Sequence, residues 1–283
     1  MKFAYYPGCS LESTAKEFDQ SIRAISSALD VELVELPDWT CCGSTSAHAT
    51  NHKLALALAA QNLALAEESK LNPVVPCSAC YNRLKTAEHS IRKNDELRGQ
   101  MEGLLGHRFT GEITTKSALE AFANDVGLVA IAKRVEKKLS GLKVVCYYGC
   151  LTSRPVKEVA FEDPENPQSM DKIVKALGAE PINWSYKTDC CGASFSITRS
   201  SMVYGMTGRI LDAAVEAGAH AIVTTCPLCQ MNLETRRKPE MKIPVFFFSE
   251  LMGLAFGLSE TQSWFKKHMV DPTPLIKSLQ LTG

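Results

Sequence analysis

Ten of the eleven cysteines form two sets with the same pattern: a single cysteine, an adjacent Cys-Cys-Gly and a Cys-x-x-Cys. Between these parts lie 31 and 34 residues in the first set, and 39 and 34 in the second. Thiolates bind iron–sulfur clusters and zinc. The repetition therefore predicts two metal centres of one kind, and we expect iron–sulfur clusters. The candidate ligands are Cys9, Cys41, Cys42, Cys77 and Cys80 in the first set, and Cys150, Cys190, Cys191, Cys226 and Cys229 in the second.

The residues around the cysteines repeat as well. Tyr5-Tyr6-Pro7-Gly8-Cys9 resembles Tyr147-Tyr148-Gly149-Cys150, which is one residue shorter. The Cys-Cys pair and the Cys-x-x-Cys recur at an offset of 149 residues. Solenoid repeats are about 20–50 residues long, so this offset indicates a duplicated domain. We expect one domain at residues 1–140 with the first centre, and another at 141–283 with the second.

The composition excludes several classes of protein. The chain has 283 residues, of which 45% are hydrophobic, and it carries 31 basic and 31 acidic side chains. No basic excess is present to neutralise phosphates, so we expect no nucleic-acid partner. The longest uncharged apolar run, Leu54–Ala66, has 13 residues, whereas a membrane-spanning helix needs about 20. No signal-peptide pattern precedes the strand-like run at 2–6. We expect a cytoplasmic protein without a transmembrane segment.

Disulfide bonds are an alternative use of eleven cysteines. Disulfide frameworks are typical of small secreted domains, and the same density in a longer cytosolic chain more often indicates metal binding or catalysis. Adjacent cysteines rarely pair with each other. The pattern therefore favours metal centres.

Strands and helices alternate along both halves. In the first half we expect strands at 2–6, 31–36 and 73–76, with helices at 12–29, 54–66 and 78–98. In the second half we expect strands near 143–148, 181–184 and 220–225, with helices near 168–178, 200–217 and 227–237. A further strand at 244–248 leads to a helix from Ser249, and its counterpart is expected at 108–113, before a helix near Ser117.

This alternation predicts an α/β fold with two duplicated parallel-sheet domains. In each half the single cysteine follows the first strand, the Cys-Cys pair follows the second, and the Cys-x-x-Cys follows the third. Because parallel strands end at the same edge of a sheet, the five cysteines should meet at its carboxyl edge, where such sheets bind ligands.

Five cysteines per half exceed what a regular centre requires. A structural zinc or a cubane cluster is usually held by four thiolates. A distorted, opened cluster with five thiolates is one way to use the fifth, and one of its irons could take up a substrate sulfur. Glycine after each Cys-Cys pair (Gly43 and Gly192) allows a tight turn there.

The motifs resemble the CCG domains found in the B subunit of heterodisulfide reductase. The resemblance rests on the two Cys-Cys-Gly motifs, on Tyr148-Gly149-Cys150, on Cys190-Cys191-Gly192-Ala193-Ser194 and on the run from Cys226 to Leu233, and it covers essentially the whole chain. It implies two noncubane [4Fe-4S] clusters that face each other across a pseudo-twofold axis, with all ten cysteines as ligands and as catalytic residues.

The resemblance also implies a reaction and partners. A disulfide, in methanogens that of coenzyme M and coenzyme B, would be reduced to two thiols with one electron from each cluster. Electrons would come from the ferredoxin-like C subunit, which is fed by the flavin-containing A subunit. A hydrogenase or a formate dehydrogenase is a further expected partner in the larger complex. The chain has no G-x-G-x-x-G after its first strand, which agrees with electrons arriving from another protein.

Two alternatives remain open on the sequence. Related CCG domains occur in subunits that pass electrons to or from a quinone or another thiol. A zinc-bearing scaffold that does not turn over is the other alternative, although one zinc per half would leave the fifth cysteine unexplained.

Several other residues are weaker candidates. Cys146 lies in an apolar strand, where a buried structural cysteine is expected. His48 and His52 have metal-binding spacing but no third ligand, so we favour a partly exposed pair. Basic residues that follow the motifs could bind the anionic tails of a substrate; these are Arg83, Lys85, Arg199, Arg236 and Arg237.

Overall fold

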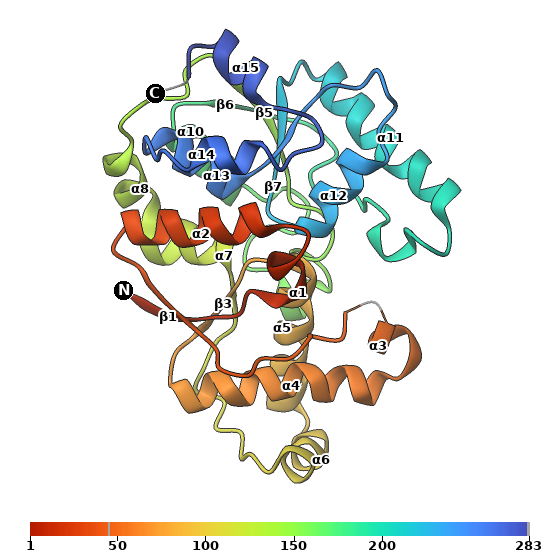
Figure 1. Ribbon diagram of the computed structural model, residues 1–283. Coiled ribbons are helices and arrows are strands. Elements are labelled where there is room, and N and C mark those ends of the chain that lie inside the picture. The colour runs from red at the N-terminus through yellow and green to blue at the C-terminus, as the bar shows by residue number, and fades with distance from the viewer. Residues whose placement is uncertain (45, 282–283) are drawn as a thin grey trace.

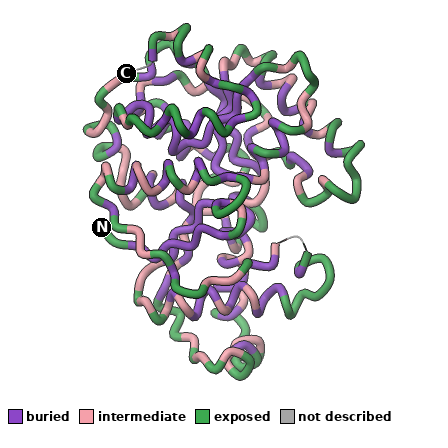
Figure 2. Tube along the Cα trace, viewed as in Figure 1, coloured by how far each residue is buried: buried purple, intermediate pink, exposed green. Residues whose placement is uncertain are grey.

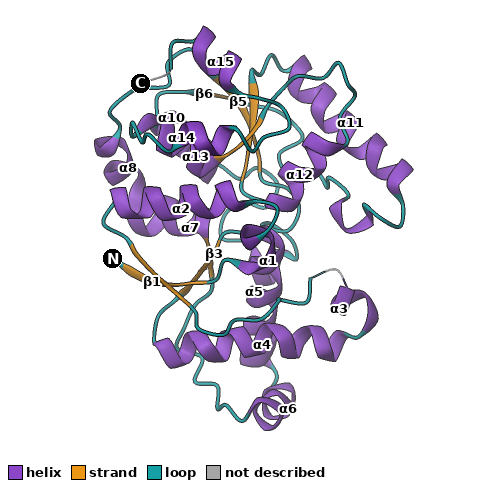
Figure 3. Ribbon diagram, in the orientation of Figure 1, coloured by secondary structure: helices purple, strands orange, loops and turns teal. Residues whose placement is uncertain are grey.

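The computed structural model describes residues 1–44 and 46–281, and it contains two parallel sheets of four strands (Figures 1 and 3). The first has the order β2-β1-β3-β4, and the second has the matching order β6-β5-β7-β8. This confirms the predicted α/β fold with two similar halves. The strands are β1 (Lys2–Tyr5), β2 (Glu32–Glu35), β3 (Pro73–Val75), β4 (Lys116–Ser117), β5 (Lys143–Tyr147), β6 (Glu180–Ile182), β7 (Ala221–Thr224) and β8 (Val245–Phe247).

Helices connect the strands of the first sheet, and their bounds refine the expected ones. The helix expected at 12–29 begins only at Lys16, and a short helix at Gly8–Glu12 that was not expected precedes it. The helix expected at 78–98 is divided at Asn94, whose side chain caps the second part. The helices are α1 (Gly8–Glu12), α2 (Lys16–Ala28), α3 (Ser46–Thr50), α4 (His52–Ser69), α5 (Ser78–Lys93), α6 (Asp95–Leu105), α7 (Ala118–Glu120), a π-helical segment (Ala121–Gly127) and α8 (Leu128–Arg134).

The second half has helices at the positions expected from the sequence and three short ones besides. These helices are α9 (Val156–Val159), α10 (Ser169–Ala176), α11 (Ser200–Glu216), α12 (Pro227–Thr235), α13 (Phe248–Ala255), α14 (Thr261–Phe265) and α15 (Thr273–Ser278), with a 3₁₀ turn at Ala193–Phe195. No helix of the described residues is both long enough and apolar enough to cross a bilayer.

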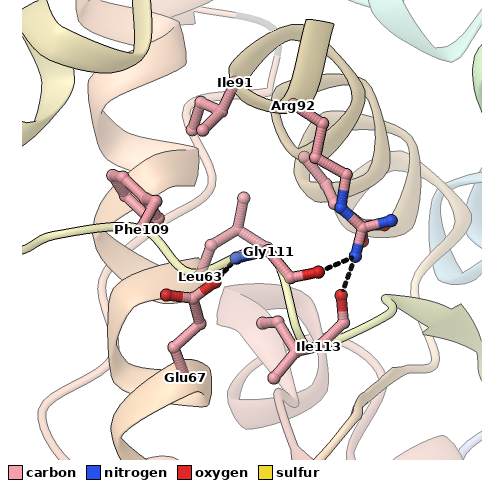
Figure 4. A pocket seen from close by; sticks show the side chains of 8 residues that line it. Leu63, Glu67, Ile91, Arg92, Phe109, Gly111 and Ile113 are labelled. Carbon is pink, nitrogen blue, oxygen red and sulfur yellow. Dashed lines mark hydrogen bonds and ion pairs between the residues drawn. The ribbon is translucent and has the colours of Figure 1, made fainter. Parts of the chain in front are cut away.

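One strand prediction was wrong. The segment 108–113 is an ordered loop, and the fourth strand of the first sheet is β4, three residues further along. The loop is held by side chains instead of a strand partner: Glu67 accepts hydrogen bonds from the amides of Thr110 and Gly111, and Arg92 donates to the carbonyls of Gly111 and Ile113 (Figure 4). Because these side chains satisfy its backbone, the loop needs no sheet neighbour.

The two halves share one continuous core. Helix α2 of the first half packs against α13 and α14 of the second, and it lies between the halves in Figure 1. Phe18 stacks on Phe247 with ring centroids 4.1 Å apart, and Ser21 and Ser249 share a 2.6 Å hydrogen bond beside them. One cluster of buried apolar residues has members in both halves, and Figure 2 shows buried chain on both sides of α2. The fold therefore fixes the position of one half relative to the other.

Candidate metal centres

All ten cysteines of the two sets lie just beyond strand ends at the carboxyl edges of the sheets. Cys9 is in α1 after β1, the Cys41–Cys42 pair follows β2, and the Cys-x-x-Cys follows β3 at the start of α5. The equivalent cysteines follow β5, β6 and β7 in the same way. The topology thus brings together each set that the spacing had grouped.

The first set is a cluster of thiols that is buried at its base and open at its rim. The Sγ atoms of Cys42 and Cys80 are 3.3 Å apart. Cys42, Cys77 and Cys80 are buried, while Cys9 and Cys41 are exposed. Hydrogen bonding from Cys41, and then from Cys80, lowers the pKa of Cys42 to about 3. A thiolate, the form that binds metal, is therefore stabilised at the centre of the set.

The second set has the same arrangement. Cys191 and Cys229 have Sγ atoms 3.5 Å apart, and both are buried with Cys226. At the rim, hydrogen bonding from Cys150 lowers the pKa of Cys190 to about 6, and the Gly192 amide also donates to the Cys190 sulfur at 3.3 Å.

The two sets meet at the interface between the halves. The side chains of Cys77 and Cys226, which are equivalent at the 149-residue offset, are close enough for each to shift the pKa of the other. Next to them, the Ser78 hydroxyl donates to the Thr225 carbonyl at 3.4 Å. Contact between equivalent residues is what a pseudo-twofold relation between the halves produces, and it makes the two candidate centres neighbours.

A pocket opens over the second set and takes part of its lining from the first half. It holds about 410 Å³ of space, part of which is open to solvent. Its wall combines second-set cysteines with Ser44, Ser78 and Ala79 from the other half. A ligand in it would contact both halves.

Tyrosines that the sequence did not single out support both sets. Tyr6 and Tyr147 follow or end the first strand of each half, and their hydroxyls donate to the carbonyls of Thr40 and Asp189 at 2.7 Å each. Those carbonyls directly precede the Cys-Cys pairs, so each tyrosine ties two cysteine-bearing loops together. The repeated Tyr-Tyr was a signal, but the one-residue difference in length concealed that Tyr6 corresponds to Tyr147.

Two buried asparagines act in a similar way and were also missed. Asn62 of α4 bonds to both the amide and the carbonyl of Thr40, at 2.9 and 3.1 Å. Asn232 of α12 donates to the Cys191 carbonyl at 2.6 Å. A lone asparagine in a helical pattern carries no spacing signal, so only the fold reveals this role.

Glycine before the single cysteine of each set is required by the thiol that faces it. Gly8 and Gly149 have φ of +72° and +70°, and a Cβ on them would lie 3.0 and 3.2 Å from the sulfurs of Cys80 and Cys229. A side chain there would combine backbone strain with pressure on a candidate ligand. The glycines after the Cys-Cys pairs also have positive φ, as expected.

The residues present fit an iron–sulfur group in each half. Each set offers five thiols, with a low-pKa thiolate among them, at the end of a parallel sheet. Cluster ligation uses such thiolates, usually four. Among residues 1–44 and 46–281, no three His, Cys, Asp or Glu side chains are placed to hold one metal ion. The fit rests on the donor chemistry of the two sets.

Several of the weaker candidates have partners other than the cysteines, or none of the kind that a metal site needs. Cys146 is fully buried in β5, as expected, and burial raises the pKa of its thiol. The His48 and His52 rings are exposed and 6.4 Å apart between centroids. Arg236 donates to the Ser196 carbonyl. Arg83 is half-buried beside the first set, with Nη1 3.0 Å from Nδ1 of His48.

Comparison with known proteins agrees with this arrangement. Residues 3–85 and 144–234 match the family model of the CCG cysteine-rich domain. An 8-methylmenaquinol:fumarate reductase membrane anchor subunit of Wolinella succinogenes is 35% identical over 97% of this chain and 99% of its own length. The B subunit of a ferredoxin:CoB-CoM heterodisulfide reductase of Methanosarcina mazei is 27% identical over 95% of this chain and 94% of its own.

A solved structure shares the fold. A hypothetical protein from Helicobacter pylori superposes with a TM-score of 0.76 at 11% identity; the match covers 95% of this chain but 52% of the other. Two matched segments, one in each half and each containing a complete five-cysteine set, show that the chain belongs to the family of proteins built from the CCG cysteine-rich domain.

Proposed function

We propose that this chain is the iron–sulfur subunit of a multi-subunit oxidoreductase and that it reduces a disulfide to two thiols. The observation that carries the proposal is the contact between Cys77 and Cys226, which makes the two thiol sets neighbours. Reduction of a disulfide breaks one S–S bond, consumes two electrons and two protons, and yields two thiols. Two adjacent one-electron centres match that requirement.

The ten cysteines would hold two [4Fe-4S] groups of the noncubane type, one in each half. Bound there, such groups would supply single electrons and an iron open to a sulfur ligand. The chain's own contribution is placement. The buried thiols would hold each group next to the interface, while Cys9 and Cys41 in one half and Cys150 and Cys190 in the other lie toward the rim.

The substrate would bind in the pocket over the second set. Ser44 and Ser78 line it from one half, and Cys150 and Cys190 line it from the other. A disulfide bound there would contact the second set directly, and it would reach the first set through Ser78 and Ala79, which lie between Cys77 and Cys80. The physiological substrate we propose is a heterodisulfide of the coenzyme M–coenzyme B kind, by analogy with the name of the Methanosarcina mazei relative.

Electrons would arrive from partner proteins. We propose that a ferredoxin-like C subunit and a flavin-containing A subunit supply the electrons in a cytoplasmic complex. A hydrogenase or formate dehydrogenase would be the ultimate source of these electrons. The relatives named as parts of reductases support an assembly of this kind.

A second candidate function is electron exchange with a quinol. It is favoured by the relative with 35% identity over nearly the whole chain, whose name gives 8-methylmenaquinol as electron donor and fumarate as acceptor. In that case the chain would receive electrons at the cysteine sets from a membrane quinol and pass them to another protein of the complex.

One experiment separates the two functions. Anaerobically purified protein is reduced with a viologen, and the rate of its reoxidation is measured with a heterodisulfide and, separately, with a soluble menaquinone analogue. We expect fast reoxidation by the disulfide. The Cys42→Ala and Cys191→Ala variants should lose it, while Cys146→Ala, which removes the thiol outside both sets, should retain it. Reoxidation by the quinone alone would favour the second function, and normal turnover by either Cys-Cys variant would contradict five-thiolate sites.

A further inference from the structure

The two halves differ in charge around their thiols at positions that the 149-residue offset makes equivalent. Arg83 on α5 is three residues after Cys80, and the equivalent residue on α12 is the neutral Asn232. Asp189 directly precedes Cys190, and the equivalent residue before Cys41 is the neutral Thr40. The first half thus has an extra positive charge beside its thiols, and the second half has a carboxylate directly next to its Cys-Cys pair, whereas the aspartate of the first half, Asp38, lies three residues before Cys41.

Arg83 lies about one helical turn after Cys80 on α5, and no acidic side chain within residues 1–44 and 46–281 forms an ion pair with it. Its Nε is buried without a hydrogen-bond partner among these residues, and its Nη1 contacts the His48 ring. The helical turn before Arg83 carries Cys80, whose sulfur is 3.3 Å from that of Cys42, so the charge of Arg83 acts on the buried part of the first set. Arg83 in turn lowers the pKa of His48, which favours the neutral ring.

The second set has a neutral residue where the first has Arg83. Asn232 is buried, with its amide on the Cys191 carbonyl and its oxygen on the Ser196 hydroxyl, 3.1 Å away. Lys187, a buried cation of this half, forms a 2.9 Å ion pair with Asp171, so the pair adds no net charge. The carboxylate of Asp189 belongs to the residue directly before Cys190, and its negative charge acts on that thiol.

We propose that Arg83 and Asp189 make the two centres unequal, so that the centre of the first half accepts an electron before that of the second. This inference rests on the proposed iron–sulfur function. A positive charge stabilises the reduced and more negative state of a nearby group, so it raises the reduction potential, and a negative charge lowers it. Both charge differences therefore favour reduction of the centre of the first half before that of the second.

The two residues should not contribute equally. Arg83 is half-buried, where charges are screened less, whereas Asp189 is exposed to water and salt. Arg83 is therefore the main positioning residue for the electron. The electron comes from a low-potential one-electron donor of the ferredoxin class, and each centre takes up one.

The test is a redox titration of anaerobic protein followed by electron paramagnetic resonance, which reads potentials and not turnover. We expect two signals with separate midpoints. In Arg83→Gln the higher midpoint should fall, and the ratio of first-half to second-half reduction should drop at least tenfold, which is about 59 mV for one electron. Arg83→Lys keeps the charge, so both of its midpoint potentials should stay close to those of the parent protein. In Asp189→Asn the lower midpoint should rise, by less than the higher midpoint falls in Arg83→Gln.

Lys93→Gln is the matched control, because it removes a charge from the exposed far end of the same helix. It should shift neither midpoint. Equal midpoints in the parent protein, or an unchanged higher midpoint in Arg83→Gln, would overturn this inference while leaving the two-centre function intact. Protein that holds no iron, or iron in one half only, would instead show that the proposed function itself is wrong.

Discussion

At the scale of single residues, the metal centres depend on how closely the chain approaches the thiols. A methyl group on Gly149 would lie 3.2 Å from the Cys229 sulfur, so close that the sulfur would have to move by a few tenths of an ångström. Tyr147 then holds the neighbouring loop through the Asp189 carbonyl. Small changes at these residues should therefore act on the metal centre before they act on the fold.

Gly149→Ala tests this reasoning. The new Cβ would lie 3.2 Å from the Cys229 sulfur, at a φ of +70° that alanine disfavours. We expect iron in the purified protein to fall from about eight to about four atoms per chain, the content of one four-iron cluster, with the circular dichroism spectrum retained. Gly205→Ala is the control, since nothing lies within 4 Å of its added Cβ. Equal iron in the two variants would argue against the close approach.

The ten cysteines could be found from the sequence because their spacing repeats. Tyr6 and Asn62 could not, because their role depends on hydrogen bonds to the Thr40 carbonyl, a backbone group that leaves no trace in residue type. The effect of Arg83 was likewise hidden until the fold brought Cys80, which is on the same helix, to the side of Cys42.

At the scale of elements, a buried ionic cluster joins α12, α13 and the segment after α14. His268 lies between Glu234 and Glu250, at 3.2 and 2.9 Å, with all three side chains buried. Glu17 on α2 faces the same cluster from the other half, and burial raises its pKa. The cluster ties the helix that bears Cys229 to the interface.

This cluster predicts a pH-dependent contribution to stability. Burial alone would lower the pKa of His268, but the charges and hydrogen bonds of the two glutamates outweigh it and raise the pKa to about 10. Because the folded pKa is above the unfolded value of about 6.5, the stabilisation is fully present below pH 6.5 and is lost as pH rises through about 10. His268→Gln should cost about 3–5 kcal/mol near pH 6, and the difference from the parent should shrink by pH 10.

Urea unfolding at both pH values checks this, with His52→Gln, an exposed histidine, as the control. A difference between the parent and His268→Gln that is independent of pH would contradict the charged cluster.

Among the element predictions, the fourth strand of the first half was misplaced. Residues 108–113 form a loop that Glu67 and Arg92 hold by hydrogen bonds, and such a loop has no periodic pattern in the sequence.

At the scale of the whole molecule, the proposed function requires the two halves to keep a fixed position relative to each other. The duplication could be predicted from the 149-residue offset, but the packing of α2 on α13 could not. An amphipathic pattern shows that a helix has an apolar face, but not which element that face contacts. The domain boundary near residue 140 stays a prediction. The backbone amides of residues 136 and 137 already bond to the Ala255 carbonyl of the second half.

Phe18→Ala tests the shared core. Phe18 is fully buried and stacks on Phe247. Its loss should lower the free energy of unfolding by about 3–5 kcal/mol, the usual cost of removing a buried aromatic ring. Both halves should still unfold in one transition, measured by circular dichroism and by intrinsic fluorescence. Phe195→Ala, at an exposed site, should cost far less. Two separate transitions in the parent protein would show that the halves are independent.

The most direct measurement of the central claim is the content of iron, acid-labile sulfide and zinc in anaerobically purified protein. Two four-iron centres predict about eight iron and about eight sulfide per chain, with no zinc. Two zinc and no iron would contradict the iron–sulfur proposal and make the chain a structural scaffold.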